Sequence, residues 1–330
     1  MPSVSVIIAT RNRLDMLRAA VASVLCQSLR DLELIVVDDA SDDGTTEWLA
    51  AQADPRIRAM RTDAAVERSA ARNLGLGSAT SARVLFLDDD DRVRADALQR
   101  LDAALDGRHR AVAAVGAYTL DDGRGNRRRG FHPRRCIERQ VWRDALFDWV
   151  APQGRTLMRT DVVRDAGGFP VQLSFAEDRD LWLRVSRLGP VVSIPQVTVD
   201  YRIHPGQHVF AQGIEAVEDV LQGHRAILSD HERTIADRMT SVRRLHREGS
   251  RALSDLEGRT AVVRFVRAIL REPWVLTSPF IRPQIARPLA KAILCVMISR
   301  RGMQAVRRVA SRMRRALHRD VWSSVPGGST

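Results

Sequence analysis

Residues 83–93 read RVLFLDDDDRV, an apolar run followed at once by four aspartates. The run has the length and composition of a short buried strand, so the acids mark the carboxyl end of that strand. Adjacent carboxylates repel one another, and a charge that leaves water without a partner costs on the order of several kcal/mol. The stretch therefore predicts a strand that ends beside a bound cation.

Two earlier apolar runs end in the same way. Residues 4–10 (VSVIIAT) lead into Arg11, and residues 32–38 (LELIVVD) lead into Asp39; segments with helical spacing or turn residues follow each run. Strands that alternate with helices predict an α/β fold with a mostly parallel central sheet and flanking helices. Because ligands bind at the carboxyl ends of such strands, we expect the polar residues after all three runs to meet in one crevice.

The size and composition of the chain indicate a globular protein. Its 330 residues, 45% of them hydrophobic, are enough for one large domain or two ordinary ones. The 3 cysteines are far apart without CxxC spacing, so neither a disulfide framework nor a zinc site is expected. The first residues, MPSVSVIIATRNR, lack the charged leader of an export signal, and no apolar run reaches the ~18 residues that span a membrane. We therefore expect a cytoplasmic protein.

The net charge of +12 is concentrated near the C-terminal end of the sequence. Residues 251–330 contain 16 Lys and Arg against 4 Asp and Glu, which leaves the first 250 residues with no net charge. A neutral body argues against a nucleic-acid-binding core, and a basic tail favours an anionic partner. Residues 288–319 combine apolar side chains with arginines, a pattern typical of contact with an anionic membrane surface. The alternative is a helical cap whose arginines are solvated.

Six motifs occur in order between residues 3 and 208. They are VSVIIATRNR, LELIVVDDASDDGT, SAARNLGL, FLDDDD, GGF and EDRDLWLR. Together they resemble the family 2 glycosyltransferases, inverting, nucleotide-sugar-dependent enzymes with the Rossmann-like GT-A fold. The resemblance implies that the protein moves a sugar from a nucleoside diphosphate sugar to an acceptor hydroxyl, in cell-envelope or other glycan biosynthesis.

The resemblance also implies a division of the chain. The GT-A catalytic domain would span residues 1–215, with a nucleotide-sugar half at about 1–110 and an acceptor half at about 111–215. The alternation of strands and helices stops near residue 216. Residues 216–330 are therefore expected to form a helical, arginine-rich C-terminal region.

The donor site that the resemblance implies lies at the strand ends and on one helix. Asp88 and Asp90 match the first and last acids of the DxD motif, whose carboxylates hold Mg²⁺ or Mn²⁺ against the donor phosphates. Asp89 and Asp91 are interpreted as supporting, capping or solvated acids. The residues expected to bind the nucleotide are Thr10 and Arg11, which line its pocket, Asp39 beside the base or ribose, Arg72 beside the diphosphate, and Asn73.

The acceptor side rests on the pair Glu177 and Asp178. By resemblance Asp178 is the general base that takes the proton from the acceptor hydroxyl, and Glu177 orients the acceptor. Because the pair begins a helix, we expect the helix dipole and any nearby arginine to lower the pKa of Asp178. His204 lies in a recurring closing segment, where it either completes the metal or diphosphate site or has a structural role.

Two other classes of protein are compared with this hypothesis. A nucleotidyltransferase acting on sugar phosphates also uses a parallel sheet and an acid pair, but it usually has a glycine-rich loop after the first strand, and IIATRNRLDM contains no glycine. A non-catalytic nucleotide-sugar-binding protein should have lost an acid from DDDD or ED, and neither motif has. The sequence leaves the sugar, the base and the oligomeric state open, and the basic tail favours a lipid-linked or envelope glycan acceptor at the inner face of the cell membrane.

Overall fold

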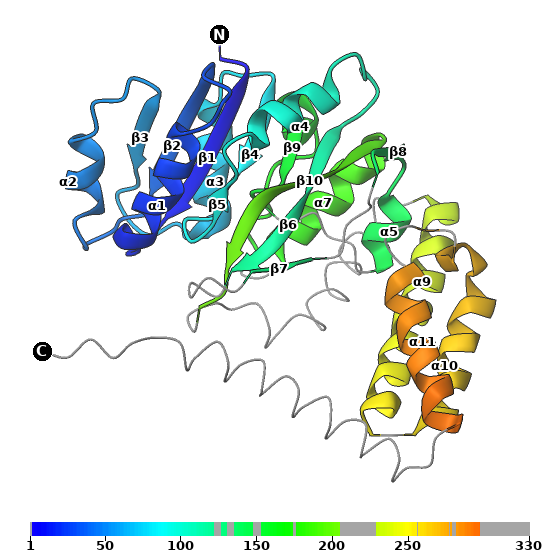
Figure 1. The fold of residues 1–330 in the computed structure, drawn as a ribbon. Helices are drawn as coiled ribbons and strands as arrows, with labels where there is room; N and C mark the ends of the chain where they lie inside the picture. Colours follow the sequence, from blue (N-terminus) through cyan, green and yellow to red (C-terminus); the bar gives the residue numbers. More distant parts are fainter. Residues whose placement is uncertain are drawn as a thin grey trace, which may run out of the picture. The chain divides into compact units, whose positions relative to one another are not determined.

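The computed structural model describes the chain in nine segments of the sequence. They are residues 2–121, 127–130, 135–147, 153–173, 176–204, 229–255, 257–276, 278 and 282–297. The chain divides into two compact units, residues 1–236 and 237–330 (Figure 1). The predicted boundary between residues 215 and 216 lies outside the described residues, so the domain limits stay a prediction.

The described part of the first unit contains one sheet of ten strands, in the order β3-β2-β1-β4-β9-β6-β10-β5, with β7 paired to β6 and β8 paired to β10. The strands are β1 (Val4–Thr10), β2 (Leu32–Asp38), β3 (Ile57–Arg61), β4 (Arg83–Phe86), β5 (Arg92–Val93), β6 (Ala113–Asp121), β7 (Arg127–Arg129), β8 (Ile137–Arg139), β9 (Thr156–Arg159) and β10 (Val191–Arg202). The predicted α/β fold is confirmed, and the strands expected from the three apolar runs are β1, β2 and β4.

The two halves of the sheet differ in strand direction. β3, β2, β1 and β4 are parallel to one another, as the alternation of strands and helices predicts. β9 is antiparallel to both β4 and β6, whereas β6 and β10 are parallel to each other. β9 therefore joins the parallel N-terminal half to a mixed second half, and it brings the residues just before Thr156 to the end of β4.

Seven helices of the first unit are described. They are α1 (Leu14–Leu25), α2 (Thr45–Ala50), α3 (Glu67–Ser78), α4 (Ala97–Leu105), α5 (Trp142–Phe147), α6 (Thr160–Asp165) and α7 (Glu177–Leu188). Successive side chains of β1 point to opposite faces of the sheet. Val6 and Ile8 join the core beneath α1 and α4, while Ile7 faces α3. Gly75 lets α3 approach closely, because a Cβ there would lie 2.5 Å from Ile7 Cγ2.

The strand register brings the polar ends of the first strands together. Thr10, at the end of β1, pairs in register with Asp38, at the end of β2. On the other side of β1, the N–H of Leu87 donates to the Ile7 carbonyl at 2.9 Å, so the chain leaves β4 directly beside β1. Residues 88–91 follow at this edge, so the polar strand ends lie side by side, as predicted.

The second unit is helical, as predicted for the C-terminal region. Its described elements are α9 (Asp230–Ser254), which begins within the first unit, α10 (Gly258–Arg271), the 3₁₀ helix η2 (Pro273–Leu276) and α11 (Arg282–Met297). Ala252, Ala261, Phe265 and Ala292 form its small buried core. Among the helices that the structure describes, none is long and apolar enough to cross a membrane.

Candidate active site

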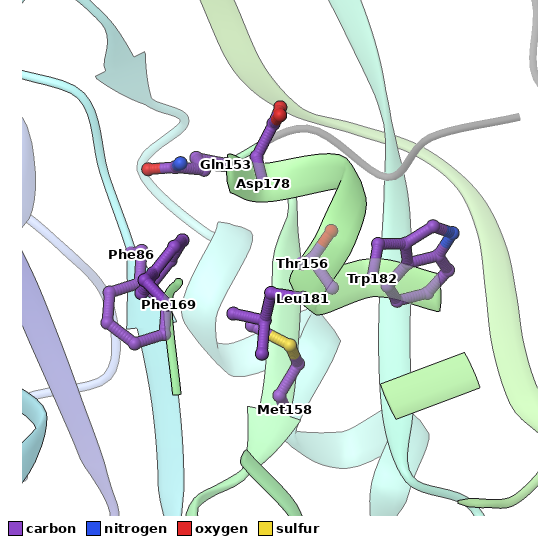
Figure 2. Close-up of a pocket in the computed structure, with 8 residues that line it drawn as sticks. All are labelled: Phe86, Gln153, Thr156, Met158, Phe169, Asp178, Leu181 and Trp182. Atoms are coloured by element: carbon purple, nitrogen blue, oxygen red, sulfur yellow. The ribbon is translucent and has the colours of Figure 1, made fainter. Parts of the chain in front are cut away.

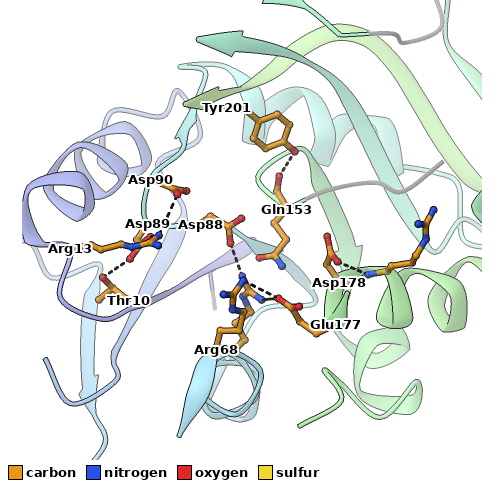
Figure 3. A network of polar contacts seen from close by, with 12 residues as sticks. Thr10, Arg13, Arg68, Asp88, Asp89, Asp90, Gln153, Glu177, Asp178 and Tyr201 are labelled. Atoms are coloured by element: carbon orange, nitrogen blue, oxygen red, sulfur yellow. Dashed lines mark hydrogen bonds and ion pairs between the residues drawn. The ribbon is translucent and has the colours of Figure 1, made fainter. Parts of the chain in front are cut away.

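The loop after β4 turns its four aspartates in two directions. The N–H of Asp91 donates to the Asp88 carbonyl at 3.2 Å and closes a tight turn. One carboxylate oxygen each from Asp88, Asp90 and Asp91 lies within 4.8 Å of the other two. Asp89 instead accepts from Thr10 Oγ1 at 2.8 Å and from Arg13 at 3.1 Å (Figure 3). The structure therefore groups Asp91 with the two predicted metal ligands and separates Asp89 from them.

The cluster of Asp88, Asp90 and Asp91 fits a hard divalent cation. Carboxylate oxygens are the ligands that Mg²⁺ and Mn²⁺ prefer, and three of them lie within 4.8 Å of one another here. Burial, together with repulsion from Asp88 and Asp90, raises the pKa of Asp91 well above its ordinary value. Burial also raises the pKa of Asp88, and it raises that of Asp89 to about 6. A bound cation would relieve this repulsion, so the chemistry of the site and its charge agree.

Side chains of the chain itself partly neutralise these acids. His204 Nε2 lies 3.0 Å from Asp90 Oδ2, which places the predicted histidine at the cluster. Arg13 is 3.1 Å from Asp89 and 3.3 Å from Asp90. Sequence reasoning assigned Arg11 to the site and missed Arg13. Arg11 is exposed, and the only signal for Arg13 is its position just before α1, where its side chain can turn back over the strand ends.

Asp39 is buried at the end of β2 and is already bonded to the chain. Its carboxylate accepts from Thr62 Oγ1 at 3.0 Å and from the N–H groups of Val66 and Glu67 at 2.7 and 3.1 Å. These two N–H groups belong to the start of α3, where a carboxylate is favoured. Asp39 therefore fixes the helix that carries Arg72, in addition to facing the crevice where its nucleotide role is predicted.

Arg72 connects the two groups of acids. From α3 its guanidinium lies 2.6 Å from Asp88 and 2.8 Å from Glu177, so one buried cation joins the loop after β4 to the start of α7. Its plane also lies over the ring of Phe169, at 5.2 Å from the centroid. Arg68, one turn earlier on α3, is 3.8 Å from Glu177 and half exposed. The planar fork of arginine suits this bridge because it donates in two directions at once.

Asn73 bonds to backbone rather than to open space. Its amide nitrogen donates to the Phe169 carbonyl, and its amide oxygen accepts the Phe169 N–H, each at 2.8 Å. Gly168 has φ +66°, and a Cβ there would lie 2.6 Å from Asn73 Oδ1. Gly168 of the GGF motif is thus required for this contact, and Asn73, predicted to bind the nucleotide, holds Phe169 in place.

Asp178 lies at the rim of a small pocket. Figure 2 shows Asp178 and Gln153 at one end of it and Met158 at the other. Phe86 and Phe169 pack edge to face there with ring centroids 4.8 Å apart. The lining residues are Phe86, Gln153, Thr156, Met158, Phe169, Asp178, Leu181 and Trp182. A carboxylate over a largely apolar pocket is suited to receive a proton from a bound hydroxyl.

The predicted lowering of the Asp178 pKa is wrong. Burial raises its pKa, and repulsion from the neighbouring Glu177 adds to the rise. The N–H of Arg179, which donates to Asp178 at 2.7 Å, and the charge of Arg72 oppose the rise without overcoming it. The sequence places Asp178 at a helix start but does not reveal that its carboxylate is desolvated. The effect of desolvation on the pKa exceeds that of the positive charges near the helix start.

Gln153 is a further residue that sequence reasoning missed. The N–H of Gly154 donates to the Phe86 carbonyl at 2.6 Å, and Tyr201 Oη donates to the Gln153 carbonyl at 2.6 Å. Gly154 has φ +74°, a conformation that favours glycine. These two hydrogen bonds fix the backbone of Gln153 at the pocket that Asp178 also lines (Figure 2). The glycine after Gln153 was the only signal in the sequence.

The comparisons with known proteins agree with this geometry. Residues 5–166 match the model of glycosyl transferase family 2. The chain belongs to glycosyl transferase family 2. The family covers the loop after β4, Arg72 and Asp39, while Glu177 and Asp178 lie beyond the matched residues. Family membership removes the support for a nucleotidyltransferase.

Two curated proteins are similar to part of this chain. The succinoglycan biosynthesis protein ExoO of Rhizobium meliloti is 37% identical over 130 residues, which cover 38% of this chain and 36% of ExoO. The Escherichia coli protein named UDP-Glc:alpha-D-GlcNAc-diphosphoundecaprenol beta-1,3-glucosyltransferase WfaP is 36% identical over 91 residues, covering 28% of this chain and 36% of WfaP. The matches thus span about a third of the length of these relatives.

A solved structure extends the likeness in fold over more of the chain. TarS 1-349 of S. aureus, in complex with UDP-GlcNAc, aligns with a TM-score of 0.62 at 19% identity and covers 89% of each chain. At this identity the match establishes the fold alone. The chain therefore has the GT-A fold that its motifs predict.

Proposed function

We propose that this chain is an inverting glycosyltransferase that moves a sugar from a nucleoside diphosphate sugar to an acceptor hydroxyl. One observation carries the proposal: Arg72 joins Asp88 of the metal-type cluster to Glu177, beside the pocket that holds Asp178 at its rim. A donor bound at the cluster and an acceptor bound at the pocket would meet between these two groups. Family membership supports this assignment of the two sides.

On the donor side, Thr10, Arg11 and Asp39 surround the base and ribose, and Arg72 binds the diphosphate. A divalent cation, Mg²⁺ or Mn²⁺, held by Asp88, Asp90 and Asp91 with His204 nearby, supplies positive charge that offsets the charge of the departing diphosphate. Asn73 contributes by holding Phe169 against Arg72.

On the acceptor side, Asp178 accepts the proton of the attacking hydroxyl. Burial raises its pKa above that of an ordinary aspartate, which makes it a stronger base once it is ionised. Glu177, fixed by Arg72, orients the acceptor without taking its proton. A single displacement with base and leaving group on opposite faces of the sugar inverts its anomeric centre.

The acceptor is proposed to be an envelope glycan attached to a lipid. This rests on the names of ExoO and WfaP, of which the first refers to polysaccharide synthesis and the second to a diphosphoundecaprenol acceptor. The protein would then act at the inner face of the cell membrane. Contact with anionic lipid through residues 288–319 stays part of this proposal, although residues 298–319 lie outside the described ones.

The test is a thermal-shift screen of UDP, GDP, dTDP and CDP, each with and without Mn²⁺. We expect one nucleotide to raise the Tm of the wild type only when Mn²⁺ is present, because ligands that bind the native state stabilise it by mass action. Asp90→Ala should lose this shift. Product formation from the corresponding sugar nucleotide then separates an enzyme from a binding protein, and a chain that no nucleotide stabilises would contradict the proposal.

A further inference from the structure

Helix α10 is apolar on two opposite faces. Its inner face packs Ala261, Phe265 and the residues around them into the core of the second unit. Its outer face carries Val263, Val266 and Leu270, which are 47%, 39% and 74% exposed. These three residues stand at positions i, i+3 and i+7, so they form one stripe along the helix. A packed helix needs only one apolar face, so the outer stripe needs another explanation.

Arginines accompany this stripe. Arg259 stands on it, and Arg267 and Arg271 lie beside it at 100° per residue. All three side chains are exposed, and the contacts of the residues that the structure describes include no hydrogen bond or ion pair from any of them. Residues 258–297 hold seven Lys and Arg and a single acid, Glu272, which lies 3.5 Å from Arg238. Among the described residues the acids Glu248 and Glu272 pair with other arginines, Arg264 and Arg238, so the face that carries Arg259, Arg267 and Arg271 is cationic.

Helix α11 repeats the pattern on a smaller scale. Its exposed residues include Ala286, Ala290 and Ile293, at i, i+4 and i+7, with Arg287 and Lys291 next to them. The inward face of α11 places Ala292 in the core with Phe265 of α10. Two packed helices thus each combine an exposed apolar stripe with exposed cations.

We propose that the outer face of α10, defined by Arg259, Val263, Val266, Arg267, Leu270 and Arg271, docks on an anionic lipid bilayer. The apolar stripe would enter the boundary between headgroups and acyl chains while the arginines contact lipid phosphates, as in helices that lie in the membrane plane. Charge complementarity favours lipid over a second copy, since two copies of this face would place like charges together. The stripe contains no aromatic side chain that would stack on bases, which argues against single-stranded nucleic acid.

This inference differs from contact through residues 288–319, and it does not depend on the proposed function. It assigns the binding to ordered, exposed side chains of α10, whatever reaction the first unit performs. The membrane acts here as a surface, which agrees with the finding that no described helix could cross it.

The experiment is flotation of the full-length chain with vesicles of phosphatidylcholine alone or with 30% phosphatidylglycerol. We expect binding to the anionic vesicles that weakens strongly between 0.1 and 0.5 M NaCl. Arg259→Gln/Arg267→Gln/Arg271→Gln should lower the partition coefficient on the order of a hundredfold, from about 1 kcal/mol per cation near the surface. Leu270→Asn should lower it about tenfold, and Leu270→Trp should restore it.

Matched controls separate this face from general charge and hydrophobicity. Arg30→Gln/Arg110→Gln/Arg143→Gln removes the same charge from exposed sites of the first unit, and Leu188→Asn changes a leucine that is 57% exposed at the end of α7. Both controls should bind like the wild type, with all variants keeping the wild-type Tm. Wild-type binding by the α10 variants would overturn the proposal. So would a dimer in light scattering that Leu270→Asn dissociates while vesicle binding is absent.

Discussion

The two acidic sites of the first unit differ in the partners of their carboxylates. In the loop after β4, Asp88 contacts Arg72, and Asp90 contacts both Arg13 and His204. At the start of α7, Glu177 pairs with Arg72, while Asp178 accepts a hydrogen bond from the N–H of its neighbour Arg179. The acid that an arginine fixes is thus separate from the acid proposed to move a proton, whose pKa is raised mainly by burial. The environment, more than the residue type, separates the two roles.

The largest effect is expected when Asp178, the proposed general base, is replaced by a neutral residue. Asp178→Asn should lower turnover about a thousandfold while nucleotide binding is kept, because it removes the general base alone. It should also raise the Tm at pH 7. A pKa raised in the folded state means that the ionised carboxylate destabilises the fold above that pKa, and Asn stays neutral.

Asp161 provides a matched control for this prediction. It lies in the first turn of α6 and accepts the N–H of the next residue, Val162, at 2.8 Å, the same local bond that Asp178 makes. Its side chain is exposed, so Asp161→Asn should change neither turnover nor Tm. Near-normal turnover of Asp178→Asn would remove Asp178 as the base.

The connection between the two sites is expected to show the next largest effect. Arg72→Gln leaves Glu177 and Asp88 without their shared buried cation, and breaking such a pair costs on the order of 3 kcal/mol. Urea denaturation should show this loss. Arg68→Gln, one turn away with a half-exposed pair at 3.8 Å, should cost less than about 0.5 kcal/mol. Equal losses from both variants would show that Arg72 is not the bridge.

The cluster after β4 can be dissected by two neighbouring substitutions. Asp91→Asn should weaken Mn²⁺ binding, measured by titration calorimetry with nucleotide present, roughly 10- to 100-fold because it removes an oxygen of the three-acid group. Asp89→Asn should weaken it several times less, since that side chain faces Thr10 and Arg13. The reverse order would mean that the turn presents Asp89 to the cation.

The smallest effect concerns the pH profile. Activity requires ionised Asp178, so kcat/KM should fall as the pH drops through its pKa, at a pH above the value of about 3.9 for an ordinary aspartate. Glu177→Gln removes the repulsion that contributes to the rise, and should move this acid limb to lower pH by a fraction of a unit. An unmoved limb would show that another group sets it.

Local sequence signals predicted the fold because they act over short distances. The apolar runs at β1, β2 and β4 and the helical spacing after β1 are enough to specify a parallel α/β half. The sequence does not predict that β9 lies antiparallel between β4 and β6, because the four residues of β9 have no local pattern that specifies their neighbouring strands. The second half of the sheet therefore needed the structure.

The candidate site was predictable in its residue types and less so in its contacts. Aspartates at strand ends indicate a cation site. The turn that begins at Asp88 places Asp91 in this site and directs Asp89 away from it. Arg13 and Gln153 reach the site through backbone conformation. The desolvation that raises the pKa of Asp178 arises from packing of distant segments, which no local pattern records.

The pair formed by Asn73 and Phe169 makes the amide proton of Phe169 a reporter of how the two halves of the first unit separate. The Asn73 side chain accepts the N–H of Phe169 and donates to the carbonyl of Phe169. It thus makes the two hydrogen bonds that a residue of a neighbouring β-strand would make. The amide can exchange with solvent deuterium only when α3 and the turn before α7 move apart. Its exchange rate would therefore measure, in the native protein, how often the donor and acceptor sides open relative to each other.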